Sequence, residues 1–315
     1  MGRAGDQRRL SRLLRKAVRR ALAVQRLALV GANGMLARKV RELVPAGCAL
    51  AEFDLPDFDI ADGDAVRAAM ERCRPAVIVN CAAYTNVDGA EADEPLAMRV
   101  NGLGPGHLAR AAGEVGAILV HVSTDYVFDG GKTTPYAEDD PVAPMSAYGR
   151  SKLAGEEAIR ASGLTAYYIV RTSWLYGPGG KNFVETVIRL ATEREELRIV
   201  DDQIGSPTYT GDLAAALFAL LDAGANRAPF GVYHFANGGE TSWYGFACEI
   251  VALMRQLGMP VAARRIVPIA TGDYPLPARR PAYSVFAGDK IRRATGMAIP
   301  AWRDSLAAYM RARID

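Results

Sequence analysis

The chain has 315 residues, of which 50% are hydrophobic and 23% are charged, and its formal net charge is +3. This balance is typical of a globular protein and excludes a disordered chain, and the length suffices for one large α/β domain with a smaller companion. No run of about 18 apolar residues occurs, so we expect no membrane span. Four scattered cysteines without C-x-x-C spacing predict a reducing, cytoplasmic location, and three histidines without H-E-x-x-H spacing predict no metal site.

Positive charge is concentrated at the start of the chain. Residues 1–26 hold nine Lys or Arg against Asp6 alone, a net of +8. Such an arm suits a helix that binds an acidic surface, nucleic acid or lipid, and it also suits a targeting peptide. We favour a dispensable extension over these alternatives, and we expect no nucleic-acid partner.

The segment "RLALVGANGMLARKV" (26–40) reads as a buried strand, a glycine turn and the start of a helix. Gly31 permits the tight turn, Gly34 lets backbone approach a pyrophosphate, and Ala37 allows close packing of helix on strand. The free N–H groups of the helix start would then stabilise the phosphates. This pattern predicts a dinucleotide-binding turn.

A carboxylate follows at the distance expected for a ribose contact. Asp54 lies at the end of the next predicted strand, suits a 2′-hydroxyl and would repel a 2′-phosphate. No arginine follows it closely, so the pattern favours NADH and leaves NADPH open. Asp59 and Ile60 could flank the adenine, and Ala83, Tyr84 and Thr85 lie where a second loop would contact the cofactor.

Strands and helices alternate along the first half of the chain. Further strands are predicted at 76–80, in "GAILVHVSTDYVFDG" (116–130) and in "LTAYYIVRTSWLYG" (164–177), with helices at 34–44, 64–73, 95–115 and 148–162. This alternation predicts a doubly wound parallel sheet, the Rossmann type of α/β fold, in which ligands bind at the carboxyl ends of the strands.

The stretch "AYGRSK" (147–152) sets Tyr148 and Lys152 on one face of a helix. A lysine charge beside a tyrosine favours the phenolate, so we predict a lowered tyrosine pKa and a role in proton transfer. Thr124, at the end of a strand, could donate a hydrogen bond to the same substrate oxygen. Lys152 could also bind the nicotinamide ribose.

Beyond about residue 175, Gly and Pro become frequent and strands become short. We therefore predict a basic extension at 1–26, a dinucleotide-binding domain at 27–172 and a mainly substrate-binding domain at 173–315. A return to the main sheet is a candidate near 231–236. Asn182 and Arg279 or Arg280 could meet a diphosphate, because an arginine fork matches phosphate oxygens.

Taken together, these residues resemble the extended branch of the short-chain dehydrogenase/reductase superfamily, which acts on nucleotide sugars. From about residue 27 to 302 the chain is similar to the dTDP-4-dehydrorhamnose reductase family. The segments that carry this resemblance are "RPAVIVNCAAYTNVDGAE", "HVSTDYVFDG", "YGRSKLAGE", "RTSWLYG", "DDQIGSPT" and "YPLPARRPAYS".

The resemblance implies NADH- or NADPH-dependent reduction of the C4 ketone of dTDP-4-dehydro-β-L-rhamnose, in nucleotide-sugar biosynthesis for cell-surface polysaccharide. It implies that Tyr148 is the proton donor, Lys152 its activator and a cofactor contact, and Thr124 the tuning hydroxyl. It also implies substrate contacts by Thr124, Asp125 and Trp174. The implied cofactor contacts are Gly34, Met35, Leu36, Asp54, Asp59, Ile60, Ala83, Tyr84 and Thr85.

Several alternatives stay open from the sequence. One is a reductase of another dTDP-4-keto-6-deoxyhexose, and another is a 4-epimerase with tightly bound NAD. A 4,6-dehydratase is less favoured, because Tyr126 stands where those enzymes place a glutamate. A non-catalytic relative resembling the regulatory β subunit of methionine adenosyltransferase would need none of the Thr124, Tyr148 and Lys152 set. A homodimer is a candidate assembly.

Overall fold

The computed structural model describes residues 26–314 and is built around a six-stranded sheet in the order β10-β5-β4-β3-β1-β2. Every pairing within this sheet is parallel. The strands are β1 (Arg26–Val30), β2 (Ala49–Phe53), β3 (Val77–Asn80), β4 (Ile118–Thr124), β5 (Tyr167–Thr172) and β10 (Gly231–His234). The predicted doubly wound parallel sheet is confirmed, and β10, which lies within the candidate range 231–236 for a return to this sheet, is its edge strand beside β5.

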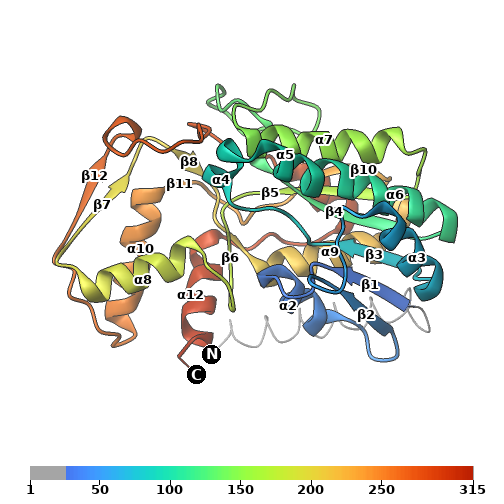
Figure 1. The fold of residues 1–315 in the computed structure, drawn as a ribbon. Helices are drawn as coiled ribbons and strands as arrows, with labels where there is room; N and C mark the ends of the chain where they lie inside the picture. The colour runs from blue at the N-terminus through green and yellow to red at the C-terminus, as the bar shows by residue number, and fades with distance from the viewer. Residues whose placement is uncertain (1–25, 315) are drawn as a thin grey trace.

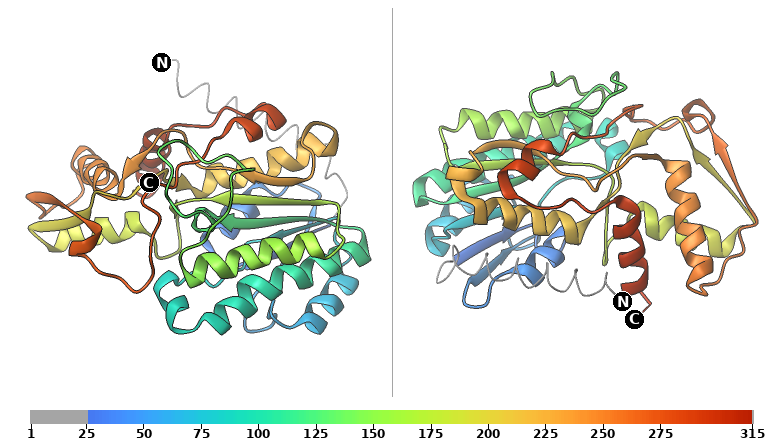
Figure 2. Two further views of the ribbon diagram at one scale, coloured as in Figure 1. Left: turned by 90° about the horizontal axis from the view of Figure 1, so that it is seen from above. Right: turned by 180° about the vertical axis from the view of Figure 1, so that it is seen from behind.

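Helices cover both faces of this sheet, as Figures 1 and 2 show. One face packs against α2 (Met35–Leu43), α9 (Thr210–Arg227) and α11 (Asp289–Thr295). The other packs against α3 (Gly63–Cys73), α6 (Gly104–Val115) and α7 (Ala147–Ala161). Successive residues of β1 serve opposite faces, with Leu27 and Leu29 in one core and Ala28 and Val30 in the other. A strand buried on both sides must be apolar throughout, which explains the continuous hydrophobic run.

The helix predicted over 95–115 is interrupted. It consists of α5 (Glu94–Ala97), the π-helical turn η1 (Met98–Leu103) and α6, and it is preceded by α4 (Val87–Ala92). The wider π turn directs the Asn101 side chain to Tyr84, where it accepts from the backbone N–H at 2.9 Å and donates to the carbonyl oxygen at 3.0 Å. The interruption thereby fixes the loop that follows β3.

The second half of the chain builds a smaller lobe with its own apolar core, at the opposite end of the molecule from β2 (Figure 1). Its helices are α8 (Phe183–Glu193), α10 (Trp243–Gln256) and α12 (Trp302–Ala312). Short strand pairs complete it: β7 (Glu196–Val200) with β12 (Arg265–Ile269), β6 (Leu175–Tyr176) with β9 (Thr208–Tyr209), and β8 (Ile204–Gly205) with β11 (Thr241–Ser242). Single-turn 3-10 helices are η2 (Asp125–Val127) and η3 (Thr271–Asp273).

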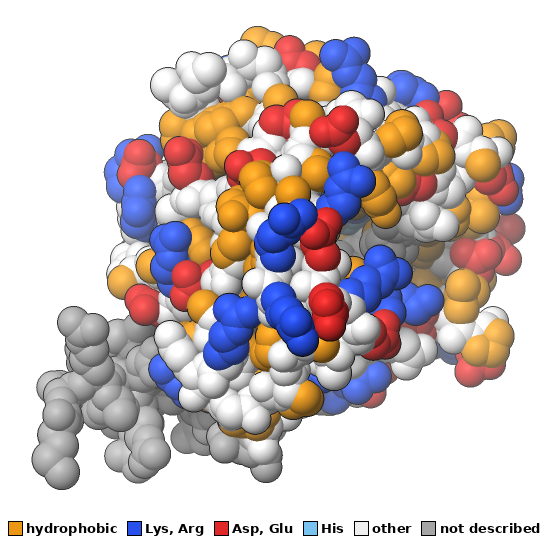
Figure 3. Space-filling view, turned by 90° about the vertical axis from the view of Figure 1, so that its left-hand side faces the viewer, with side chains coloured by type: hydrophobic (Ala, Val, Ile, Leu, Met, Phe, Trp, Pro, Cys, Tyr) orange, Lys and Arg blue, Asp and Glu red, His pale blue; other side chains and the backbone are white. Residues whose placement is uncertain are grey.

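The exposed end of the smaller lobe carries both signs of charge. Figure 3 shows Lys and Arg side chains interspersed with Asp and Glu on this face.

Across residues 26–314, no helix combines the length and apolar character needed to cross a membrane. The predicted basic extension lies at 1–26, so all of it except Arg26 falls outside the described residues.

Candidate active site

A cavity of about 670 Å³ opens at the carboxyl ends of β1, β3, β4 and β5. This is where β2 and β3 lie on opposite sides of β1, the position at which doubly wound sheets bind ligands. The cavity brings together most of the predicted site residues: Gly31, Gly34, Met35, Leu36, Asp54, Asp59, Ile60, Ala83, Thr85, Thr124, Asp125, Tyr148, Lys152 and Trp174. Tyr84, Asn182, Arg279 and Arg280 do not line it.

The glycine turn between β1 and α2 (residues 31–34), called the glycine cradle below, has the backbone conformation that a dinucleotide-binding turn requires. Gly31 has a φ of +76°, and a Cβ there would lie 2.5 Å from the backbone nitrogen of Ala82. Gly34 precedes the first residue of α2, and no side chain caps the helix start. The first residues of the helix line the cavity, and their N–H groups are free to donate to a phosphate there.

Asp54 stands directly after β2, at the rim of this cradle. Its carboxylate accepts from the backbone N–H of Asn33 at 2.7 Å and of Leu55 at 2.8 Å. These two bonds fix the carboxylate beside the glycine turn, where a ribose hydroxyl can reach it. The cradle, the helix start and this carboxylate together fit the adenosine half of a dinucleotide.

Helix α7 carries Tyr148 and Lys152 and is held in register at its first turn. Ser146 caps it by accepting from the N–H of Gly149 at 3.1 Å. A Cβ on Gly149 would overlap the carbonyl oxygen of Tyr126, so only glycine allows α7 this close to the η2 turn. The glycine inside the "YGRSK" motif thus sets the position of both functional side chains.

The Lys152 side chain is buried and turns toward β4. Its Nζ donates to the carbonyl oxygen of Val122 at 2.7 Å and lies 3.4 Å from Nε2 of His121. Nδ1 of His121 in turn lies 2.9 Å from the amide nitrogen of Asn80. Burial lowers the pKa of Lys152 to about 8.

The predicted lowering of the Tyr148 pKa is wrong for the protein alone. Burial raises the pKa of Tyr148 to about 12, and the hydroxyl of Thr124 offsets only part of that rise. The physical reason is that the Lys152 ammonium is bound to Val122, so desolvation of the phenol dominates. A tyrosine that keeps its proton at neutral pH is a proton donor rather than a base.

Two polar groups at the end of β4 face the same cavity. The Thr124 hydroxyl donates to Oδ1 of Asp125 at 3.0 Å and accepts from the N–H of Tyr126 at 3.2 Å. Oδ2 of Asp125 is buried and has no hydrogen-bond partner among the described residues. Burial raises the pKa of Asp125 to about 6, and the nearby hydroxyls of Ser284 and Thr124 offset part of that rise. This oxygen can accept a hydrogen bond from a ligand hydroxyl, and that bond would offset the free-energy cost of burying the carboxyl group.

Trp174 lines the cavity and lies between β5 of the main sheet and β6 of the smaller lobe. Its backbone has a φ of +47°, which is uncommon for a bulky residue and is often found at functional sites. Its ring stacks on Trp243 with centroids 3.5 Å apart and planes 7° from parallel. The indole is therefore held as a flat surface beside the cavity.

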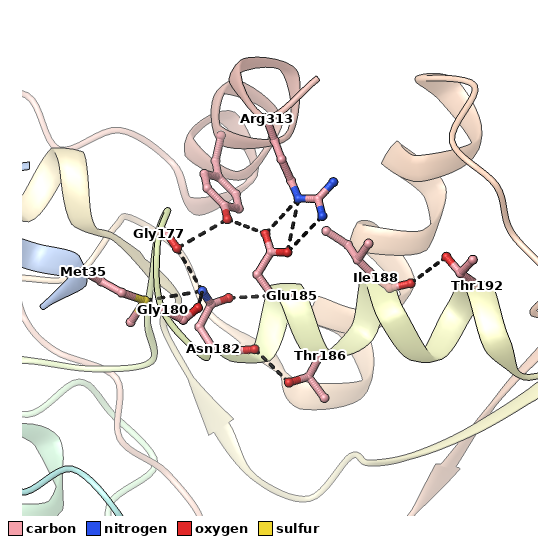
Figure 4. A network of polar contacts seen from close by, with 10 residues as sticks. Met35, Gly177, Gly180, Asn182, Glu185, Thr186, Ile188, Thr192 and Arg313 are labelled. Carbon is pink, nitrogen blue, oxygen red and sulfur yellow. Dashed lines mark hydrogen bonds and ion pairs between the residues drawn. The ribbon is translucent and has the colours of Figure 1, made fainter. Parts of the chain in front are cut away.

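Asn182 lies at the start of α8, where its side chain is used within the protein (Figure 4). It accepts from the N–H of Glu185 at 3.1 Å and donates to the carbonyl oxygens of Gly177 at 2.9 Å and Gly180 at 3.2 Å. Its amide also lies 3.4 Å from the sulfur of Met35. These contacts tie the lobe to the glycine turn, and a diphosphate contact by Asn182 stays a prediction.

The two arginines of "PARRP" lie in different surroundings. Arg280 is paired with Asp88 of α4, at 3.1 Å from Oδ1 and 2.7 Å from Oδ2. The N–H of Ala278 also donates to this carboxylate at 3.1 Å, so the segment after η3 is fastened to the main domain. Arg279 lines a separate cavity of about 990 Å³ between α8, β7 and that segment. Its contact with a diphosphate stays a prediction.

A buried ion pair that the sequence analysis did not predict joins helix α7 to β5. Glu156 and Arg171 are 0% and 2% exposed, and two bonds of 2.8 Å join them. Ser123 donates to the same carboxylate at 2.7 Å. Glu156 follows Lys152 by one helical turn, a spacing that could have indicated that it shares the buried face of α7. Three elements, β4, β5 and α7, are thereby tied together.

Within residues 26–314, no three His, Cys, Asp or Glu side chains are grouped so that they could hold a metal ion.

The sheet, the glycine cradle and the tyrosine–lysine pair define a dinucleotide-dependent reductase of the extended short-chain dehydrogenase/reductase type. The family model described as "RmlD substrate binding domain" matches residues 25–314. A dTDP-4-dehydrorhamnose reductase from Burkholderia thailandensis is 41% identical over 293 residues, which is 91% of this chain and 98% of that protein. The chain belongs to the dTDP-4-dehydrorhamnose reductase family.

Solved structures agree with this assignment. A dTDP-4-dehydrorhamnose reductase from Clostridium acetobutylicum is 40% identical with a TM-score of 0.86, and the match covers 92% of this chain and 100% of that protein. The enzyme from Bacillus anthracis, solved in complex with NADP, has a TM-score of 0.85 and 39% identity, covering 91% of this chain and 99% of its own.

Proposed function

We propose that this chain reduces the C4 ketone of dTDP-4-dehydro-β-L-rhamnose to give dTDP-β-L-rhamnose, in nucleotide-sugar biosynthesis for cell-surface polysaccharide. The observation that carries the proposal is the convergence of Thr124, Tyr148 and Lys152 on one cavity beside the glycine cradle. NADH or NADPH supplies the hydride when bound. The names of the relatives and the NADP in the Bacillus anthracis structure support the substrate and the cofactor.

Tyr148 protonates the oxygen of the reduced ketone. Its raised pKa keeps the hydroxyl protonated at neutral pH, and the alkoxide formed by hydride addition is a strong enough base to take the proton. The Thr124 hydroxyl lies beside it and can donate to the same oxygen once it releases Asp125. Two donors aimed at one oxygen stabilise the negative charge that develops there.

Lys152 has two tasks in this scheme. Its ammonium, which donates to the Val122 carbonyl, would hold the ribose hydroxyls of the bound cofactor, and it would contribute positive charge on the same helix face as the phenol that must lose its proton. A positive charge there stabilises the phenolate after transfer. The pKa of about 8 keeps Lys152 mostly protonated at neutral pH, so the charge is present when it is needed.

The sugar would lie between the end of β4 and the smaller lobe. Oδ2 of Asp125 would accept from a sugar hydroxyl, and the stacked indole of Trp174 would offer an apolar surface. We propose that residues 27–172 mainly bind the dinucleotide and that residues 173–315 mainly bind the substrate. A cytoplasmic homodimer is part of the proposal, and light scattering of the purified chain would test the assembly.

The test is turnover with the proposed substrate. The purified chain is incubated with dTDP-4-dehydrorhamnose, supplied by the upstream enzymes, and the absorbance of NADH and NADPH is followed separately. We expect cofactor oxidation, and NMR of the product should give the C4 configuration of rhamnose. A product of opposite C4 configuration would indicate a reductase of another 6-deoxyhexose. A folded chain without turnover, recovered with a stoichiometric partner enzyme, would indicate a regulatory subunit.

A further inference from the structure

Two buried polar residues, His121 and Asn80, take no part in the proposed reaction, although His121 lies beside its lysine. They are register partners on neighbouring parallel strands, with His121 on β4 and Asn80 on β3, so their side chains project from the same face of the sheet. Leu119 projects from that face too and shares a core with Ile159 of α7. The imidazole therefore faces the helix that carries Lys152.

The hydrogen bonds of Asn80 fix the protonation state of His121. Oδ1 of Asn80 accepts from the backbone N–H of Ala82 at 3.0 Å, so the other end of the amide, 2.9 Å from Nδ1 of His121, is the NH₂ donor. Nδ1 must then be the unprotonated acceptor, and the proton of the neutral ring lies on Nε2. Burial and the neighbouring Lys152 charge lower the pKa of His121 well below its usual value, which agrees with a neutral ring.

The protonated ring nitrogen faces the ammonium of Lys152. Nε2 lies 3.4 Å from Nζ, and an N–H at that position cannot accept a hydrogen bond from an ammonium. One of the three ammonium N–H groups donates to the Val122 carbonyl at 2.7 Å. The other two find no acceptor on the imidazole, and Lys152 lines the dinucleotide cavity. They are therefore available to a ligand in that cavity.

We propose that His121 and Asn80 are positioning residues of the reaction: the fixed Nε2–H repels the Lys152 ammonium and keeps its two free N–H groups directed at the ribose hydroxyls of the dinucleotide. This assignment rests on the proposed dinucleotide-dependent function. With the opposite tautomer, Nε2 would accept from the ammonium and draw it away from the cavity. The orientation of one buried amide, that of Asn80, therefore decides where the ammonium points.

An N–H that faces the ammonium also disfavours its charged form, in addition to the burial that lowers the pKa of Lys152 to about 8. Removing that N–H should raise the pKa of Lys152, so that the side chain stays charged to higher pH. The variants that test the proposal leave unchanged the other ionisable side chains near Tyr148 and Lys152, which are Cys81 after β3, Asp125 of η2, Tyr148 and Glu156 of α7, and Arg171 of β5, which pairs with Glu156.

The first variant, Asn80→Asp, reverses the polarity of the contact while nearly keeping its shape. One carboxylate oxygen still accepts from Ala82 and the other accepts from Nδ1 of His121, so Nε2 becomes an acceptor for the ammonium. Titration calorimetry on the full chain measures the Kd of NADH from pH 6 to 10. At pH 7 we expect NADH to bind about tenfold more weakly, the scale of one hydrogen bond to a charged group.

The pH dependence separates this effect from structural damage. The unmodified chain should lose affinity for NADH above about pH 8, where Lys152 loses its charge. In Asn80→Asp that loss should begin about one pH unit higher, because the ammonium gains an acceptor and a nearby negative charge. The deficit of the variant should therefore shrink as the pH rises. A merely damaged fold would weaken binding by the same factor at every pH.

The second variant, His121→Asn, removes the N–H without adding a charge or drawing the ammonium away. It should also move the loss of affinity to higher pH, with a smaller deficit at pH 7 than Asn80→Asp. The matched control is His234→Asn. His234 is equally buried, its Nε2 lies 3.4 Å from Nη1 of Arg171, and it does not line the dinucleotide cavity. This control should leave the pH dependence of NADH binding unchanged.

Nitrogen NMR of the unmodified chain, labelled at its three histidines, reads the tautomer without relying on any variant at the site. We expect His121, assigned by the spectra of His107→Gln and His234→Asn, to stay neutral with its proton on Nε2 from pH 5 to 8. A proton on Nδ1 would overturn the proposal, as would an unmoved pH dependence in both Asn80→Asp and His121→Asn. Failure of the unmodified chain to bind NADH or NADPH would instead contradict the proposed function.

Discussion

Replacing Tyr148 with phenylalanine removes one hydroxyl while leaving the shape of the cavity almost intact. General acid catalysis contributes about 10²- to 10⁴-fold in rate. We expect a loss near the upper end, because each neighbouring donor must leave another partner before it can reach the substrate oxygen. Thr124 donates to Asp125 at 3.0 Å, and the Lys152 ammonium donates to Val122 at 2.7 Å. A loss of 10³- to 10⁴-fold corresponds to about 4–5 kcal/mol of transition-state stabilisation.

The assay follows oxidation of the reduced nicotinamide with dTDP-4-dehydrorhamnose, giving kcat and KM for each variant. Tyr148→Phe should lower kcat and leave KM within a few-fold, since the ring still fills its place. Tyr126→Phe is the matched comparison, because that ring contacts the Tyr148 ring edge-on with centroids 5.4 Å apart. If Tyr126→Phe cost more turnover than Tyr148→Phe, the proton donor would have been assigned to the wrong tyrosine.

Three further predictions concern stability and helix placement. Glu156→Gln should lower the free energy of unfolding by about 3–5 kcal/mol in urea titrations, because it leaves the charge of the buried Arg171 uncompensated. The control is Glu157→Gln at the neighbouring exposed position, which should lower the free energy of unfolding by less than about 0.5 kcal/mol. Equal losses in the two variants would contradict the burial argument. Between pH 4 and 6 the Asp125 carboxyl ionises in the unfolded chain (pKa 3.8) but stays protonated in the folded one (about 6), so this group costs stability as the pH rises. Relative to the unmodified chain, Asp125→Asn should therefore gain about 2 kcal/mol of stability from pH 4 to 7, and a pH-independent difference would count against this reasoning. Gly149→Ala should lower both activity and melting temperature, because its Cβ meets a backbone carbonyl; a stabilised, fully active variant would show that α7 can move without cost.

The sequence predicted the parts of the fold that obey local rules. Continuous apolar runs and glycine turns located β1, β3, β4 and β5, because a strand covered on both faces has apolar side chains on both of them. The same rules located the residues at the strand ends, since the carboxyl ends of parallel strands meet at one edge. The sequence alone therefore predicts that Thr124 and the glycine turn share one cavity, as they do in the structure.

The features of the fold and the site that the sequence did not predict depend on contacts between distant segments. The pairing of Arg280 with Asp88 joins residues 192 positions apart, and no spacing rule indicates it. The direction of the Tyr148 pKa depends on where the Lys152 ammonium points, which is set by a carbonyl on β4.

The order of the elements along the chain limits how this protein can be divided. After building α8 and β7 in the smaller lobe, the chain returns to the main sheet as β10, pairs with β5, and then leaves again for α10. A fragment ending at residue 172 would leave β5 as an open edge without its partner strand, and edges of that kind promote aggregation. Expressing either half separately should therefore give insoluble material, and ligand-binding studies require the intact polypeptide.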